Sequence, residues 1–274
     1  MRSSLAAFFL GACLAAPAAA KTDLAPHANE IFPLLIADPR HVRLSASYYR
    51  LDGRDVSDLA LGHAWGLARR RTGESQDWLW ESDLEAMAYS RFRVGGGVRE
   101  FETADLLAAL PVTVRRGDVS FKGSLFHENS VAGDGYVRRT GDAGGRFSVE
   151  GLRAQAALEP CRFARAYAGA EYLLRTVPTP KRWALQGGLE LTAPELGPRG
   201  AWAATPFIAE DLQWRERVQW NPDSHLVAGL KFSRRDAPSR ALRAAFGYYD
   251  GHSPYGRFYA RRTHYADLSV SLEL

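Results

Sequence analysis

Apolar and polar residues alternate at the C-terminus of this sequence. Every even position in 266–274 is apolar, and every odd position between them is polar. Because successive side chains of an extended strand point to opposite faces, this segment predicts a strand with one apolar and one polar face. The same period recurs elsewhere, for example at 226–233 and 183–192. Helical stripes at three-four spacing are hard to find, so the pattern predicts an all-β fold.

The alternating segments number twelve. They are expected at 42–51, 58–69, 77–92, 101–115, 118–128, 146–159, 163–175, 181–192, 202–214, 218–233, 240–249 and 265–274. Such lengths suit a tilted membrane strand, which needs about 9–11 residues. Compact turns are expected after the even-numbered strands, and long connections after the fifth (129–145) and the eleventh (250–264). Long loops at one end and short turns at the other are typical of an outer-membrane β-barrel, with both termini facing the periplasm.

A secretory signal peptide is expected at residues 1–20. Arg2 gives a positive start, an apolar run follows at 5–16, and small residues precede Lys21. These are the parts of a cleavable export signal, and the apolar run is too short to span a bilayer as an anchor. Lipidation at Cys13 is an alternative form of processing, because Leu-Gly-Ala-Cys resembles a lipoprotein cleavage box.

The exported chain would then consist of two parts. Residues 21–41, in which two prolines interrupt IFPLLIADPR, are expected to form an N-terminal periplasmic lead rather than a strand. Residues 42–274 are expected to form the barrel. Cys161 would be the single remaining thiol, so stability must come from backbone pairing and packing rather than from an internal disulfide. Export with a positive start indicates the envelope of a Gram-negative bacterium.

The composition excludes several other classes of protein. Hydrophobic residues make up 46% of the 274 residues, without the run of about 20 apolar residues that a membrane helix needs. The 35 basic and 31 acidic residues give a net charge of only +4, and no basic block with interleaved aromatics supports nucleic-acid binding. The seven histidines show no metal-ligand spacing, so we expect neither a metal nor a cofactor.

Alternation alone does not separate a membrane barrel from a soluble sheet. A soluble periplasmic ligand-binding protein would bury its apolar face, whereas a membrane barrel exposes that face to lipid. The export signal permits a membrane barrel, and aromatic residues cluster at strand ends as interface girdles require. The chain also ends on an alternating strand, which closure of a barrel would seal. We therefore favour a transmembrane up-and-down β-barrel, although its last residue, Leu274, is not the usual aromatic.

Four stretches resemble an uncharacterised family of bacterial outer-membrane β-barrels, a domain-of-unknown-function family. They are IFPLLIADPR at 31–40, SLFHENSVAGD at 124–134, NPDSHLVAGLKF at 221–232 and YYDGHSPYGRFY at 248–259. The resemblance implies an outer-membrane location and a barrel, and no reaction. The expected partners are outer-membrane lipid and, during insertion, the barrel-assembly machinery.

His127 and Ser130 are candidates for a catalytic pair. The sequence FHENS around them loosely resembles the His-x-Ser strand motif of outer-membrane phospholipase A, another twelve-stranded barrel in which both side chains face lipid. The resemblance implies a lipid hydrolase with His127 as general base. Here, however, Asn129 stands two residues after the histidine. A strand that continued straight would also point Ser130 to the opposite face. We therefore favour a non-catalytic role and keep the hydrolase as an alternative.

A loop motif and a set of inward charges are the remaining candidates. The motif comprises Asp250, Gly251, His252, Ser253, Pro254, Tyr255 and Gly256. It is expected either to line the mouth of the barrel or bind a partner, or simply to supply turn residues. The expected lumen charges are Arg165, Glu171, Arg175, Arg182, Glu190, Lys231 and Arg243. Mixed charges of this kind form cross-strand pairs, so we expect a plugged or narrow lumen.

Overall fold

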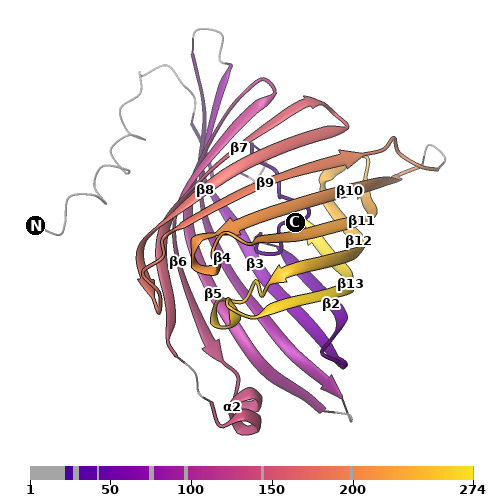
Figure 1. The fold of residues 1–274 in the computed structure, drawn as a ribbon. Coiled ribbons are helices and arrows are strands. Elements are labelled where there is room, and N and C mark those ends of the chain that lie inside the picture. The colour runs from indigo at the N-terminus through magenta and orange to yellow at the C-terminus, as the bar shows by residue number, and fades with distance from the viewer. Residues whose placement is uncertain are drawn as a thin grey trace, which may run out of the picture.

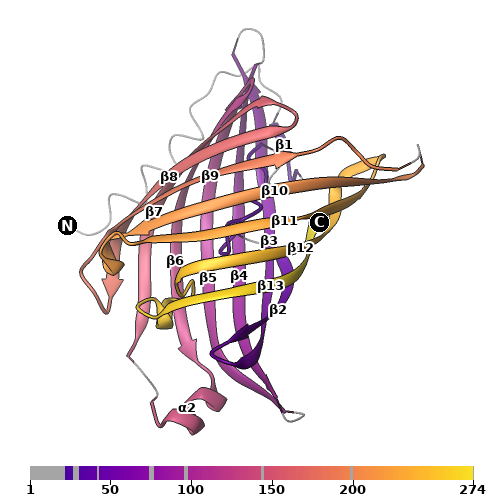
Figure 2. The ribbon, with the colours of Figure 1, turned by 45° about the vertical axis from the view of Figure 1, so that its right-hand side comes forward.

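A closed antiparallel β-barrel dominates the fold (Figure 1, Figure 2). The computed structural model describes residues 22–26, 31–41, 43–73, 77–95, 98–142, 145–197 and 200–273. Within them the barrel strands are β2 (Leu44–Leu51), β3 (Arg54–Thr72), β4 (Trp78–Gly95), β5 (Val98–Arg116), β6 (Val119–Ala132), β7 (Phe147–Cys161), β8 (Ala164–Val177), β9 (Trp183–Thr192), β10 (Trp202–Arg215), β11 (Pro222–Arg234), β12 (Ala237–His252) and β13 (Arg262–Glu273). The expected signal peptide at 1–20 lies outside the described residues.

Each barrel strand pairs with its neighbours in the chain, and β13 pairs with β2 to close the ring. The twelve expected strands are therefore all confirmed. One more short strand, β1 (Thr22–Leu24), pairs with the far end of β3. Leu272 of β13 lies opposite Leu44 of β2, so the barrel begins and ends at the same end, as an even number of strands requires.

The other end of the barrel carries the helical turns. The helix α2 (Asp134–Thr140) connects β6 to β7, the turn η1 (Glu216–Val218) connects β10 to β11, and the turn η2 (Gly256–Phe258) connects β12 to β13. This end is called the α2 end below (Figure 1). None of the helices in the described part of the chain has the length and apolar character needed to cross a membrane. The connection expected at 129–145 is shorter than predicted, because β6 continues to Ala132.

The outer face of the barrel is apolar. Large hydrophobic side chains remain exposed along the strands, among them Leu268 at 65%, Phe246 at 55% and Phe121 at 51%. Phe246 and Leu268 lie opposite each other on β12 and β13. The residues that alternate with these along each strand point inward, so the alternation in the sequence becomes an apolar outer face and a polar inner face.

Candidate functional site

The interior of the barrel is occupied by the chain that precedes β2. Residues 31–41, called the lumen segment below, run inside the barrel rather than along its outside (Figure 2). Ile31, Leu35 and Ala37 have no exposed surface, and Phe32 has 1%. Phe32 and Leu35 pack on inward side chains of β7 and β8, and Ile36 and Ala37 pack on those of β10 and β11. Burying these apolar side chains stabilises the segment where it lies.

Arg165 and Glu190 hold the middle of the lumen segment. The guanidinium of Arg165 donates to the carbonyl oxygens of Pro33 at 2.9 Å and Leu34 at 2.5 Å. It also pairs with Glu190 at 2.6 Å. Glu190 in turn accepts the backbone N–H of Ile36 at 2.7 Å. The pair therefore satisfies backbone groups of the segment that would otherwise be buried without partners, which is costly inside a protein.

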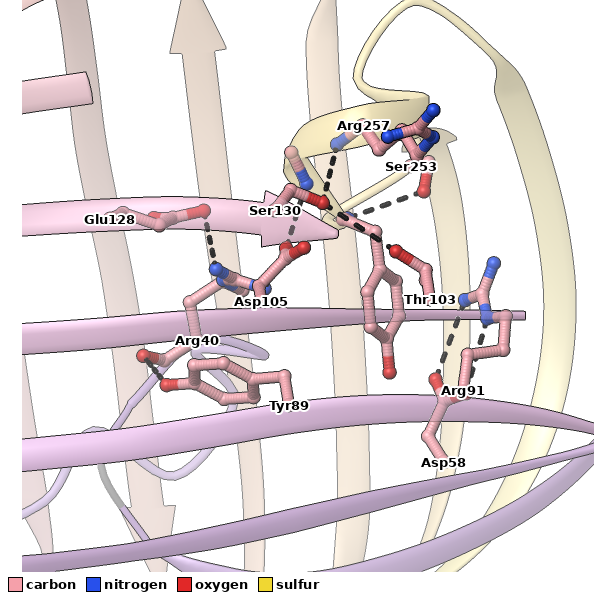
Figure 3. A network of polar contacts seen from close by, with 12 residues as sticks. Arg40, Asp58, Tyr89, Arg91, Thr103, Asp105, Glu128, Ser130, Ser253 and Arg257 are labelled. Atoms are coloured by element: carbon pink, nitrogen blue, oxygen red, sulfur yellow. Dashed lines mark hydrogen bonds and ion pairs between the residues drawn. The ribbon is translucent and has the colours of Figure 1, made fainter. Parts of the chain in front are cut away.

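Arg40 fixes the end of the lumen segment to a second part of the wall (Figure 3). Its guanidinium pairs with Asp105 of β5 at 2.8 Å and with Glu128 of β6 at 2.6 Å. The same group lies over the ring of Tyr89, 4.1 Å from its centroid. The Tyr89 hydroxyl donates to the carbonyl oxygen of Arg40. Charge-assisted hydrogen bonds of this kind are the stronger ones in proteins, so this end is firmly anchored.

Two further side chains of the wall bind the backbone and side chain of the segment. Nδ1 of His225 lies 2.7 Å from the carbonyl oxygen of Ala37. Because a carbonyl only accepts, Nδ1 carries the proton, and Nε2 faces Asp267 at 3.7 Å. Gln186 of β9 donates to the carboxylate of Asp38 at 3.1 Å. Contacts to the segment therefore come from most of the barrel's circumference.

The loop between β12 and β13 folds inward and closes the α2 end. Tyr255 is 4% exposed, and its ring lies 4.3 Å from the guanidinium carbon of Arg91. Arg91 pairs with Asp58 at 3.1 Å (Figure 3). Phe258 of η2 packs against Tyr136 of α2 with ring centroids 5.2 Å apart. The loop therefore lies at the mouth of the barrel, with the side chains of Tyr255 and Phe258 buried.

Backbone amides of this loop bind inward side chains of β5 and β6. The N–H of Gly256 donates to Asp105 at 2.8 Å, so this carboxylate joins the loop to Arg40 of the lumen segment. The N–H of Arg257 donates to the hydroxyl of Ser130 at 3.1 Å (Figure 3). The two elements that fill the barrel are therefore held by one connected polar network.

The first residues of the loop motif bind Asp223 of β11. Asp223 accepts the N–H of His252 at 2.6 Å and pairs with Arg215 at 2.6 Å. A Cβ added to Gly251 would lie 2.6 Å from a carboxylate oxygen of Asp223, so only glycine fits at this close approach. Asp250 lies at the exposed rim, where Arg262 pairs with it at 3.2 Å. The motif therefore combines turn formation with closure of the lumen.

Two of the cavities beside the lumen segment have a volume of about 70 Å³ or more. The first, of about 70 Å³, lies between the segment, the β12–β13 loop and the walls of β6 to β10; it is called the arginine cavity below because four arginines line it. The second, of about 100 Å³, lies between the segment and the wall of β2 and β13. Its lining includes the hydroxyls of Ser45, Ser47, Ser269 and Ser271. Both are large enough for a few water molecules, each of which occupies about 30 Å³ in the liquid.

Five of the seven expected lumen charges lie on the inner face. Besides Arg165 and Glu190, Glu171 pairs with Arg153 at 2.9 Å. Lys231 and Arg243 both pair with Glu273, the former at 3.2 Å. Opposite charges meet across neighbouring strands, as expected for a lumen filled by side chains rather than an open channel.

Arg175 departs from the expectation and points away from the lumen. Its side chain is 66% exposed and pairs with Glu150 on the outer face at 3.6 Å. In the register of β7 and β8, Glu150 lies opposite Arg175 and Gly151 lies opposite Leu173. Leu174 is therefore an extra residue, and this bulge reverses the alternation beyond it. A strict period of two could not show the reversal.

Arg182 also departs from the expectation, because it lies in the connection before β9 rather than in the lumen wall. Its guanidinium donates to the carbonyl oxygens of Leu173 at 2.6 Å and Leu174 at 2.7 Å. Its backbone N–H, with that of Trp183, donates to Glu216 of η1. These two hydrogen bonds lower the pKa of the Glu216 carboxyl below its ordinary value. Arg182 thus stabilises the connections at the α2 end.

The structure does not bring His127 and Ser130 together. Ser130 is 6% exposed and points into the barrel, where its hydroxyl lies 3.5 Å from that of Thr103. His127 points outward, since β6 continues as a regular strand through both residues. Its ring lies between two other outward side chains, Glu150 at 3.4 Å from Nδ1 and Asn129 at 2.6 Å from Nε2. A hydroxyl nucleophile is not among these neighbours of His127.

Several charged residues of the lumen wall are not among the seven lumen charges expected from the sequence, although the alternation could have revealed them. Glu81, Asp83 and Glu85 occupy alternate positions of β4 and are all at most 5% exposed. Lys122 of β6 pairs with Glu85 at 2.6 Å, and both side chains are buried. Asp105 follows the same inward phase on β5. The inward role of the lumen segment had no comparable signal, because it is not a strand.

The closed barrel, its apolar outer face and its polar, filled interior define an outer-membrane-type β-barrel. The family profile described as "Protein of unknown function (DUF1207)" matches residues 9–273. The chain belongs to this family. The resemblance expected from the four stretches quoted above is thereby confirmed. No curated protein matches the chain.

Two solved structures with a TM-score above 0.5 support the fold. The chain is similar to outer membrane phospholipase A from Escherichia coli, with a TM-score of 0.54, 11% identity and coverage of 86% of this chain and 93% of that one. The chain is also similar to the Salmonella typhi outer membrane phospholipase dimer with bound calcium. The TM-score is 0.51 and the identity 10%, and the match covers 89% of this chain and 94% of that one. A weaker match is the KdgM porin, with a TM-score of 0.44, 8% identity and coverage of 85% of this chain and 99% of that one. At such identities the likeness concerns the fold alone.

Proposed function

We propose that this protein is an integral outer-membrane barrel with a non-catalytic role, a narrow pore held closed by its own lumen segment and by the β12–β13 loop. The observation that carries the proposal is the buried lumen segment, anchored by Arg165 and Glu190 in its middle and by Arg40 at its end. A barrel serving only as a scaffold could fill its lumen with wall side chains. A separate segment bound through polar contacts is instead suited to moving as a unit.

The outer apolar face supports a membrane location over a soluble one. A soluble sheet protein would cover residues such as Phe246 and Leu268, which here are more than half exposed. Inside the barrel, by contrast, charged side chains are buried in pairs. An apolar exterior around a polar interior suits lipid surroundings. The hydrolase alternative is not proposed, because Asn129 rather than a hydroxyl accompanies His127 on the outer face.

Arginine placed in the middle of the outer face is expected to destabilise the barrel. We expect Phe246→Arg to cost about 2–4 kcal/mol and Tyr248→Arg, two residues nearer the α2 end of β12, to cost less, since the cost of Arg falls to about 0–1 kcal/mol near the interfaces. The free energy of unfolding in urea, measured in phospholipid vesicles by tryptophan fluorescence, tests this. Equal costs at both positions in vesicles would argue against a lipid-embedded face.

The wild-type barrel is expected to conduct poorly. We expect vesicles that contain the purified protein to admit small sugars hardly faster than protein-free vesicles, because the lumen segment and the β12–β13 loop fill the interior. Swelling of the vesicles in isotonic sugar solutions, followed by light scattering, measures this. A twelve-stranded barrel of known open lumen serves as the positive control. Swelling by this protein at the rate of that control would contradict the closed state.

A further inference from the structure

The arginine cavity collects four guanidinium groups, from Arg40, Arg153, Arg215 and Arg217. They come from the lumen segment, β7, β10 and η1, so the cavity is assembled from parts of the chain far apart in sequence. Pro254 and Gly256 of the β12–β13 loop also line it, and so do three carboxylates, those of Asp38, Glu128 and Glu171. Cations confined in a small space repel one another, so each needs a compensating negative charge.

Three of the four guanidiniums have carboxylate partners within the protein. Arg40 pairs with Asp105 and Glu128, as described above. Arg153 donates to Glu171 through Nε at 3.2 Å and through a terminal nitrogen at 2.9 Å. The same two kinds of nitrogen of Arg215 bind Asp223 at 3.0 and 2.6 Å. These contacts compensate the positive charge of the three groups.

Arg217 is the exception. Within the described residues its guanidinium has neither a hydrogen bond nor an ion pair; it lies instead 5.6 Å from the ring centroid of Phe147 and 5.9 Å from that of Tyr259. Burial and the nearby Arg215 lower the pKa of Arg217 below its ordinary value, and the carboxylates of Glu171 and Glu128 offset this lowering only in part. The side chain still remains charged at neutral pH, because arginine is not deprotonated in proteins.

We propose that the arginine cavity binds a small anion, a carboxylate or a phosphate, through Arg217. The planar fork of a guanidinium matches both oxyanions in two parallel hydrogen bonds. Arg153 and Arg215 each have one terminal nitrogen that is not engaged by their carboxylates in the contacts given above, and both line the same cavity. Two amides, from Gln186 and Gln213, add polar lining. The rings of Phe147 and Tyr259 hold the Arg217 side chain in place by cation–π attraction.

The proposal does not depend on conduction, so it is tested on the purified full-length protein in detergent. Sodium acetate and sodium phosphate are titrated separately by calorimetry against wild type, with glycerol as a neutral probe. We expect saturable binding of at least one anion and none of glycerol. Arg217→Gln removes the charge and is expected to weaken that binding at least about tenfold, because a charged hydrogen bond is lost.

The matched control is Arg262→Gln, which removes an exposed arginine at the same end of the barrel and outside the cavity. It is expected to bind the anion as wild type does. Arg217→Lys keeps the charge without the fork and is expected to bind with intermediate affinity, which gives a second variant if Arg217→Gln does not fold. The absence of saturable anion binding by wild type would overturn the proposal. Anion binding by folded Arg217→Gln with the affinity of wild type would also overturn it, and if only Arg217→Lys folds, the same result with that variant would do so. Equal losses of affinity in Arg217→Gln and Arg262→Gln would overturn it as well.

Discussion

Deleting residues 31–41 is expected to raise the single-channel conductance of the barrel by about an order of magnitude, since the segment fills the middle of the lumen and its loss leaves the β12–β13 loop as the remaining constriction of a narrow water path. The deleted residues supply apolar volume at Ile31, Phe32, Leu35 and Ala37, all essentially buried. They contribute none of the barrel's twelve strands, which begin at Leu44. Conductance in planar bilayers, recorded in parallel with wild type, measures the change.

The matched control for this deletion removes residues 22–26 instead. These residues lie upstream, and the three that pair with β3 are exposed, so conductance should stay at the wild-type value. A full-length variant, Arg40→Ala/Arg165→Ala, keeps the segment but loses two of its anchors, and should open the pore part of the time. A folded barrel lacking 31–41 that conducts no better than wild type would refute the proposal that the lumen segment holds the pore closed.

Arg165→Ala is expected to lower the free energy of unfolding by about 3–5 kcal/mol, because it leaves Glu190 as a buried charge without its partner. The carbonyl oxygens of Pro33 and Leu34 lose their donors at the same time. Equilibrium unfolding in urea, in vesicles, measures the loss. Glu190→Gln should cost less, since an amide oxygen can still accept the N–H of Ile36.

Two further variants separate the buried pair from ordinary surface charges. The double variant Arg165→Ala/Glu190→Ala should cost less than the sum of the two alanine variants, because no unpaired charge remains. Arg234→Ala breaks an exposed pair with Asp236 and should change the free energy of unfolding little, because solvent screens that pair. If Arg165→Ala costs no more than Arg234→Ala, the pair does not anchor the lumen segment.

The strands were predictable because their signal is local. A residue on a β-strand repeats its direction every second position, and membrane surroundings force that repeat to be strict over a whole strand. The expected strand at 265–274, for instance, corresponds to β13 at Arg262–Glu273. The prediction failed where local geometry broke the period, as at the bulge beside Leu174 that turned Arg175 outward. A bulge depends on the partner strand, which the period does not reveal.

The candidate site was less predictable, because contacts across the barrel create it. Asp105 illustrates the reason: its carboxylate binds Arg40 and the N–H of Gly256, which are 65 residues before it and 151 residues after it. Ser130 was a candidate because it lies close to His127 in sequence. Its hydroxyl, however, accepts a hydrogen bond from the β12–β13 loop on the inner face of the barrel, whereas His127 is on the outer face. Sequence proximity is a poor guide where neighbours alternate between two environments.

The sequence by itself determined that this chain forms about twelve strands, each with one apolar and one polar face, since that pattern lies in the residues of the strands themselves. The tertiary structure decided that the apolar face is the outer one. Only the tertiary structure decided what fills the barrel. Residues 31–41 carry apolar side chains and prolines that would suit an external lead equally well. They lie inside because closure of β2 on β13 creates a lumen whose buried charges, Arg165 and Glu190 among them, require partners that the segment's backbone supplies.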